Sequence, residues 1–275
     1  MLRRWWDFAD PTGDVAGGPA AAGPVCHSPG MTVFDDLAAE QDRLDHILSG
    51  LDEAQWTSPS GAAGWTIADV VLHLAQSEEG VMVTVSGRGL RTGLGATTGG
   101  TVEERVAEMV RAERAAPEVV FGRWQRARPS ALDALRAADP SQPVEWVTGP
   151  VKPATLATTR LAEHWAHGLD ITEPLGVGFP DTDRLRHVAW LAHRTLPYAM
   201  TLAGEQPAEV WCELTAPDGR SAWQFGKPDA DSAITGQAGT FCRVAARRLD
   251  PADSGLTVTG PHGATALRLL RTYAQ

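Results

Sequence analysis

The chain has 275 residues, 43% of them hydrophobic, which suffices for one large or two modest domains with a sizeable core. Its net charge of −10 argues against nucleic acid or an anionic membrane as a partner, because both attract basic surfaces. No apolar run approaches the ~18 residues of a membrane span and the N-terminus lacks a signal-peptide core, so we expect a cytoplasmic protein that acts on small molecules.

Residues 1–30 are rich in glycine, proline and alanine and show no hydrophobic period. We predict that they form a disordered extension, with Met31 as an alternative start of the protein. A lid or partner-binding arm that carries Trp5 and Trp6 is the functional alternative.

From Thr32 onward, apolar residues recur at steps of three and four, which predicts a helix with one buried face. A second helix is predicted to begin near Ile67. Residues 56–64, with one proline and two glycines, are expected to form the loop before it. Both helices carry an N-terminal capping signature, Thr32 with Asp35 and Thr66 with Asp69.

Four further helices are predicted, near residues 101–115, 118–138, 156–173 and 183–203. A glycine-rich run over 87–100 precedes them. Pro129 should interrupt or kink the second of these helices, because proline removes a backbone donor. Residues 146–153, WVTGPVKP, are interpreted as a loop.

After about residue 203 the hydrophobic period shortens, which is typical of strands. Short strands are expected at 210–214, 222–225, 232–235 and 256–259, with helices near 238–248 and 262–274. We therefore predict an α+β chain of three parts. These parts are the extension 1–30, a helical domain 31–203 and a smaller α+β domain 204–275.

The segment LAEHWAHGLD, residues 161–170, places Glu163 and His167 one turn apart on one helix face. His164 lies about 100° from Glu163 around that helix, so we favour His167 over it. With His73 on the second helix, the pair would form a His₂Glu set, the number of protein ligands in catalytic zinc sites. The alternatives are a solvated helix face for the pair and a hydrogen-bonded or solvated helix-rim histidine for His73.

Three segments resemble the DinB-like superfamily in its mycothiol-dependent maleylpyruvate isomerase branch: GWTIADVVLHL, WVTGPVKPATLATTRLAEHWAHGLDI and GQAGTFCRVAARR. The resemblance covers residues 32–275 and is strongest to actinobacterial proteins described only as metal-binding. It implies an N-terminal four-helix metal-binding bundle and a small α/β C-terminal domain. Its W(S/T)xxDVxxHL and ExxxH motifs imply His73, Glu163 and His167 as the metal ligands.

The resemblance also implies roles for residues beside these ligands. Asp170 follows His167 in an HxxD arrangement and is expected to orient its imidazole, with a surface carboxylate as the alternative. Arg247 or Arg248 falls where the isomerases carry an arginine important for activity. Either would hold a substrate carboxylate through its two-pronged donors, and a surface charge at a helix end is the alternative.

In the isomerases, the resemblance implies, a divalent metal, usually zinc, holds mycothiol as its thiolate. The thiolate adds to an activated cis double bond, rotation follows, and elimination gives the trans product; a transferase would stop after addition or displacement. The ligand-flanking residues and the final segment ALRLLRTYAQ depart from the isomerases. We therefore expect a small electrophile other than maleylpyruvate as substrate, with the thiol as cosubstrate, and a monomer or homodimer.

Other functions suit the same predicted site. Two histidines and a carboxylate also fit Fe²⁺ with oxygen, Ni²⁺, or a lyase or hydrolase that activates water. A non-catalytic metal- or ligand-binding protein would bind without turnover. A nucleophilic cysteine is the least favoured, because Cys26, Cys212 and Cys242 lack CxxC spacing and the last two fall in a strand and an apolar helix.

Overall fold

The computed structural model of the protein describes residues 32–87, 101–147 and 149–272. The predicted disordered extension over 1–30 and most of the glycine-rich run over 87–100 lie outside the described residues. None of the helices in the described ranges combines the length and apolar composition that a bilayer crossing requires.

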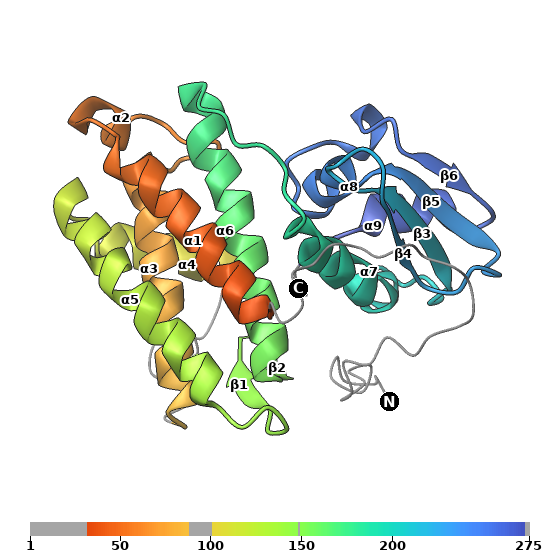
Figure 1. Cartoon of the computed structure of the whole chain (residues 1–275), viewed down its shortest axis with the longest axis horizontal. Helices are drawn as coiled ribbons and strands as arrows, with labels where there is room; N and C mark the ends of the chain where they lie inside the picture. Colours follow the sequence, from red (N-terminus) through yellow and green to blue (C-terminus); the bar gives the residue numbers. More distant parts are fainter. Residues whose placement is uncertain (1–31, 88–100, 148, 273–275) are drawn as a thin grey trace.

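Four long helices pack side by side as a bundle (Figure 1), in which α1 and α3 each contact both α5 and α6. The two shorter helices α2 and α4 lie beside α3. The bounds of these helices are α1 Val33–Ser49, α2 Glu53–Thr57, α3 Ile67–Val85, α4 Val102–Ala112, α5 Pro117–Ala137 and α6 Pro153–Leu175. The predicted helical bundle is therefore confirmed.

The two predicted capping signatures are present at the starts of α1 and α3. The Thr66 amide donates to Asp69 at 3.0 Å, and the Asp69 amide donates back to the Thr66 hydroxyl at 3.2 Å. The Thr32 amide donates to Asp35 at 2.9 Å. These bonds satisfy amides that have no partner inside the helix, so the sequence fixes where both helices begin.

Local predictions at two of these helices, α2 and α5, need correction. The expected loop over 56–64 begins two residues late, at Ser58, because helix α2 extends to Thr57. Asp52 caps the start of this helix by accepting from the Gln55 amide at 2.8 Å. Helix α5 runs through Pro129 without interruption. Proline there removes one backbone bond, and the burial of its neighbours Ala131 and Leu132 holds the helix together.

The expected loop over 146–153 is instead largely a β-hairpin. Strands β1 (Val144–Trp146) and β2 (Gly149–Val151) pair antiparallel. The hairpin was missed because each strand has only three residues, which is too few for a period of two to show.

The C-terminal part is a four-stranded mixed sheet in the order β4-β3-β5-β6, in which β3 and β5 are parallel and the other pairs antiparallel. Helix α8 packs on β3 and β5, and α9 packs on β5 and β6. The elements are α7 Leu185–Leu202, β3 Val210–Thr215, β4 Ala222–Phe225, β5 Ser232–Gln237, α8 Ala238–Ala245, the 3₁₀ turn η3 Pro251–Asp253, β6 Thr257–Thr259 and α9 Gly263–Leu269. The predicted α+β class is thus confirmed.

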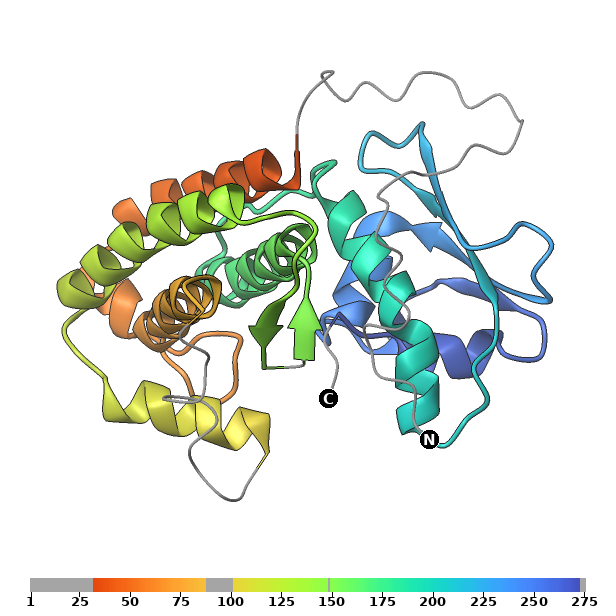
Figure 2. The same cartoon turned by 90° about the horizontal axis from the view of Figure 1, so that it is seen from below.

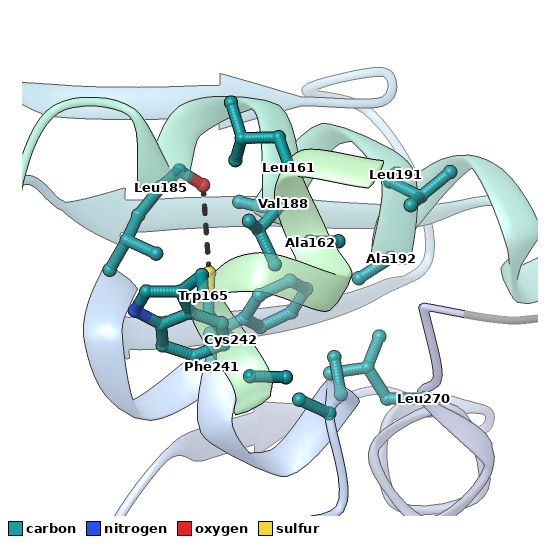
Figure 3. Close-up of a cluster of buried hydrophobic side chains, with 14 of the residues drawn as sticks. Leu161, Ala162, Trp165, Leu185, Val188, Leu191, Ala192, Phe241, Cys242 and Leu270 are labelled. Atoms are coloured by element: carbon teal, nitrogen blue, oxygen red, sulfur yellow. Dashed lines mark hydrogen bonds between the residues drawn. The ribbon is translucent and has the colours of Figure 1, made fainter. Parts of the chain in front are cut away.

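Helix α7 lies between the bundle and the sheet in both views (Figures 1 and 2). It packs on α6 on one side and on α8 and α9 on the other. Figure 3 shows this seam, where Trp165 from α6, Val188 from α7 and Phe241 from α8 form one buried apolar cluster. Because this cluster is continuous across both parts of the chain, it holds the polar residues of α6 in a fixed position relative to the C-terminal part.

Candidate metal centre

His73, Glu163 and His167 meet where α3 packs against α6. One ligand atom from each lies within 4.8 Å of the others. The Glu163 Oε2 atom lies 3.5 Å from Nε2 of His73 and 3.5 Å from Nε2 of His167. The structure therefore brings together the three residues that the sequence motifs singled out, from positions 90 residues apart in the chain.

The two imidazoles are held in place by an aromatic side chain. The Trp65 ring lies 5.3 Å from the His73 ring and 6.3 Å from the His167 ring, measured between centroids. The two imidazoles themselves are 5.0 Å apart and edge to face. This packing restricts the rotamers of both histidines, which keeps their Nε2 atoms directed at Glu163.

The protonation states of the three residues follow from burial and from their mutual contacts. Burial lowers the pKa of His73, so its imidazole is neutral near pH 7. Burial would raise the pKa of Glu163, but its hydrogen bonds with His167 and His73 outweigh that effect and hold the pKa well below its usual value. The anionic carboxylate keeps 35% of its side chain exposed, so it remains within reach of a bound cation.

Asp170 lies directly behind His167 and accepts a hydrogen bond from its Nδ1 at 2.8 Å. Burial would lower the pKa of His167, yet its bonds with Asp170 and Glu163 outweigh burial and raise it. A proton on Nδ1 leaves the Nε2 lone pair free to bind a metal. Asp170 thus makes the contact that the HxxD spacing led us to expect.

Arg248 joins this group, and Arg247 does not. The Arg248 guanidinium donates to Asp170 from Nε at 2.7 Å and from Nη2 at 2.5 Å, and its Nη1 donates to the Ala246 carbonyl at 2.6 Å. Arg247 is exposed and takes a left-handed backbone conformation, with φ 61°, just after α8 ends. That turn ends the helix and brings the next residue back toward α6.

His164, the other histidine of the segment, belongs to the core. It is fully buried, and its Nδ1 bonds the Arg160 carbonyl at 2.8 Å while its Nε2 accepts from the Trp124 indole at 3.3 Å. Burial lowers the pKa of His164 to about 3. Both ring nitrogens therefore already have partners in a neutral imidazole, which leaves none for a metal.

A buried ion pair was missed in the sequence. Glu78 on α3 is fully buried, and its Oε1 accepts from Nε of Arg160 on α6 at 3.0 Å. Burial raises the pKa of Glu78, and the charge of Arg160 opposes that shift. The available signal was a glutamate between the apolar positions Leu74 and Val81 on one helix face.

A cavity of about 400 Å³ opens beside the three clustered residues. Its lining comes from α3, α4, the β-hairpin, α6, α7 and the segment after α8, so it lies at the junction of the bundle and the C-terminal part. Trp65, Trp146 and Leu191 supply apolar surface, and Arg160 and Arg248 supply positive charge. This volume suits a small ligand.

The thiols of the described residues lie elsewhere. Cys212 and Cys242 are both fully buried and do not line the cavity. Burial raises the pKa of Cys212 to about 12 and that of Cys242 well above its usual value. Neither is a thiolate at neutral pH, so neither is a nucleophile. Cys26 lies outside the described residues.

Comparisons with known proteins agree with this fold. The family model of the mycothiol maleylpyruvate isomerase N-terminal domain matches residues 37–172, a range that contains the three clustered residues. An uncharacterized protein found in two strains of Mycobacterium tuberculosis is 32% identical over an alignment of 245 positions, which covers 87% of this chain and 94% of the relative.

Two crystal structures are similar to the chain as a whole. They are those of the mycothiol-dependent maleylpyruvate isomerase and of a histidine-to-alanine mutant of it, at 16% and 15% sequence identity. Both give a TM-score of 0.56 and cover 83% of this chain and 95% of their own. At this level of identity the likeness shows a shared fold.

Proposed function

Because the chain belongs to the DinB-like, mycothiol-dependent maleylpyruvate isomerase-like family, we propose that it is a zinc-dependent enzyme that uses a low-molecular-weight thiol such as mycothiol on a small electrophile. The reaction is of the isomerase or S-transferase type. The observation that carries the proposal is the convergence of His73, Glu163 and His167 beside the cavity.

The donor set fits a divalent cation. Two imidazole nitrogens and one carboxylate oxygen are the three protein ligands found in many catalytic zinc sites. The 3.5 Å separations of Glu163 Oε2 from both Nε2 atoms are close to the roughly 3.3 Å between ligands that 2.0–2.1 Å bonds give in a tetrahedron. Fe²⁺ and Ni²⁺ accept the same donors, so the metal itself is part of the proposal.

The residues of this chain would divide the work as follows. His73, Glu163 and His167 would hold the cation, and Asp170 keeps the His167 Nε2 lone pair available through its bond to Nδ1. A bound divalent cation stabilises a neighbouring thiol as its thiolate, which is the nucleophile. Trp65 covers the two imidazoles, and the cavity leaves space for the electrophile beside the thiol.

Metal content measured by elemental mass spectrometry tests the proposal. We expect about one zinc per chain in the purified protein, as in mononuclear catalytic sites, and a sharp loss in His73→Ala and Glu163→Ala. The exposed His46→Ala is the matched control and should retain the metal. Calorimetric binding of mycothiol and thiol consumption with a panel of electrophiles would then follow.

Two outcomes would contradict the proposal. Protein that takes up no stoichiometric metal after reloading with zinc, iron or nickel would leave the clustered histidines without a catalytic role. A metal-loaded protein that neither binds mycothiol nor consumes any electrophile with it would point to other metal chemistry, and oxygen uptake by the iron form would identify an oxygenase.

A further inference from the structure

Arg160 lines the cavity on α6, three residues before Glu163. Its side chain is 4% exposed, and its Nε donates to Glu78 at 3.0 Å. Its terminal nitrogens form no hydrogen bond with a described residue, and Nη2 is fully buried. A buried guanidinium N–H without a partner is costly, so a ligand or water is expected to complete its hydrogen bonding.

Gln76 is a second buried polar residue of the same cavity with unused capacity. Its Nε2 donates to the Met109 carbonyl at 3.2 Å and to Glu113 at 3.1 Å, which fixes the orientation of the amide. Its Oε1 is buried and has no partner within the described ranges. The cavity therefore carries a cationic donor and a neutral acceptor that the protein itself does not satisfy.

Arg248, the other arginine that lines the cavity, already has hydrogen-bond partners for its guanidinium nitrogens. All three guanidinium nitrogens of Arg248 already donate within the protein, two of them to Asp170 and one to Ala246. A substrate carboxylate could take up this guanidinium only by displacing Asp170 from it. Of the two arginines that line the cavity, Arg160 is the one whose terminal nitrogens have no hydrogen-bond partner among the described residues.

We propose that Arg160 is the specificity-determining residue that binds a carboxylate of the electrophilic substrate, with Gln76 Oε1 accepting a hydrogen bond from a polar group of the ligand. Two terminal N–H groups of a planar guanidinium match the two oxygens of a carboxylate. The negative groups that face the cavity are Glu163, which the metal would neutralise, and the exposed Glu103. The inference rests on the proposed function and refines its substrate class.

Isothermal titration calorimetry of the full chain with succinate tests the proposal, because succinate carries carboxylates but no electrophilic double bond. The titration is done on the metal-loaded protein and on protein stripped by a chelator, so that the metal cannot be the anion receptor. Succinamide is the neutral probe and inorganic phosphate the tetrahedral one. We expect succinate to bind both forms, with weaker binding of phosphate and none of succinamide.

The decisive variants keep the buried charges balanced. Glu78→Gln with Arg160→Gln should lose succinate binding by roughly 10- to 100-fold, the range of a charged hydrogen-bonded pair. Arg184→Gln removes an arginine that pairs with Glu40 outside the cavity, and this control should bind succinate like the wild type. Arg248→Gln should lose less binding than the double variant. Arg160→Lys retains a cation opposite Glu78 and serves as the test if the double variant does not fold. Lysine lacks the paired N–H donors of the guanidinium, so this variant should bind succinate several-fold more weakly.

Unchanged binding in the Arg160 variants, loss of binding in Arg248→Gln instead, equal binding of succinamide or phosphate, or no succinate binding by the wild type would each overturn the inference. Metal content and thiol turnover are measured separately. A protein that binds succinate through Arg160 but shows no thiol chemistry would refute the proposed function and leave this site in place.

Discussion

His164 and His167 stand three residues apart on α6, yet they lie in two regions with opposite properties. His164 faces the core, where the Arg160 carbonyl and the Trp124 indole satisfy both ring nitrogens. His167 faces the cavity, where Asp170 engages Nδ1 and Nε2 points at Glu163. A polar group whose partners are all internal contributes to stability, whereas one that keeps a free lone pair can bind a ligand.

The same contrast separates two glutamates close to these histidines, Glu78 near His164 and Glu163 near His167. Glu78 is fully buried and pairs with Arg160, and Glu163 is partly exposed and lies between two imidazoles. If the contrast is correct, changes on the core side should lower stability and spare the metal. Changes on the cavity side should weaken metal binding and leave the free energy of unfolding nearly unchanged.

The largest effect is expected from Glu78→Ala, which leaves the Arg160 guanidinium charged and without its buried partner. We expect the free energy of unfolding to fall by about 3–5 kcal/mol, the usual cost of breaking a buried ion pair. Urea denaturation measures it. Glu79→Ala is the matched control, since Glu79 pairs with Arg123 at the surface and its loss should cost about 1 kcal/mol or less. Equal losses at both positions would show that the buried pair is not special.

The two histidines provide the direct comparison. His164→Ala should lower the free energy of unfolding by about 2–4 kcal/mol, because it leaves a cavity and the buried Trp124 indole N–H without its partner, while zinc content stays unchanged. His167→Ala should weaken zinc binding by more than the roughly 10- to 100-fold that loss of a residue behind a metal ligand causes. Competition with a chromophoric chelator measures the affinity. Loss of zinc in a His164→Ala protein that is shown to be folded would contradict the assignment of His164 to the core.

A smaller effect is expected from Asp170→Asn, which weakens the hydrogen bond that orients the His167 imidazole. Zinc affinity should fall about 10- to 100-fold near pH 8. Asp36→Asn is the control, since Asp36 bonds His187 at 2.8 Å in the same way but outside the cavity, and it should leave zinc affinity unchanged.

The pH profile of the same two proteins sharpens this prediction. Asp170 and Glu163 outweigh burial and raise the pKa of His167, so protons compete with zinc at a higher pH than they would at an ordinary histidine, and zinc affinity falls as the pH drops. Without the Asp170 charge this pKa falls and competition begins at lower pH. The ratio of wild-type to variant affinity should therefore be smaller at pH 6 than at pH 8. A ratio independent of pH would mean that Asp170 acts on His167 by geometry alone.

The sequence by itself determined the α+β class, the starts of α1 and α3, and the placement of Glu163 and His167 on one helix face. These features are local, because capping and helical spacing involve residues three or four apart. Helical spacing made His73 only a candidate for the third ligand, and the family motif linked it to the pair, since a motif carries the result of tertiary contacts that periodicity cannot show.

Only the tertiary structure decided between Arg247 and Arg248, paired Glu78 with Arg160, and assigned His164 to the core. The Arg248–Asp170 bond joins residues that lie 78 positions apart in the chain, and the Arg160–Glu78 bond joins residues that lie 82 positions apart. Which side chains meet across such distances depends on how α3, α6 and the end of α8 pack together. That packing is set by apolar contacts along whole helices, which no short stretch of sequence specifies.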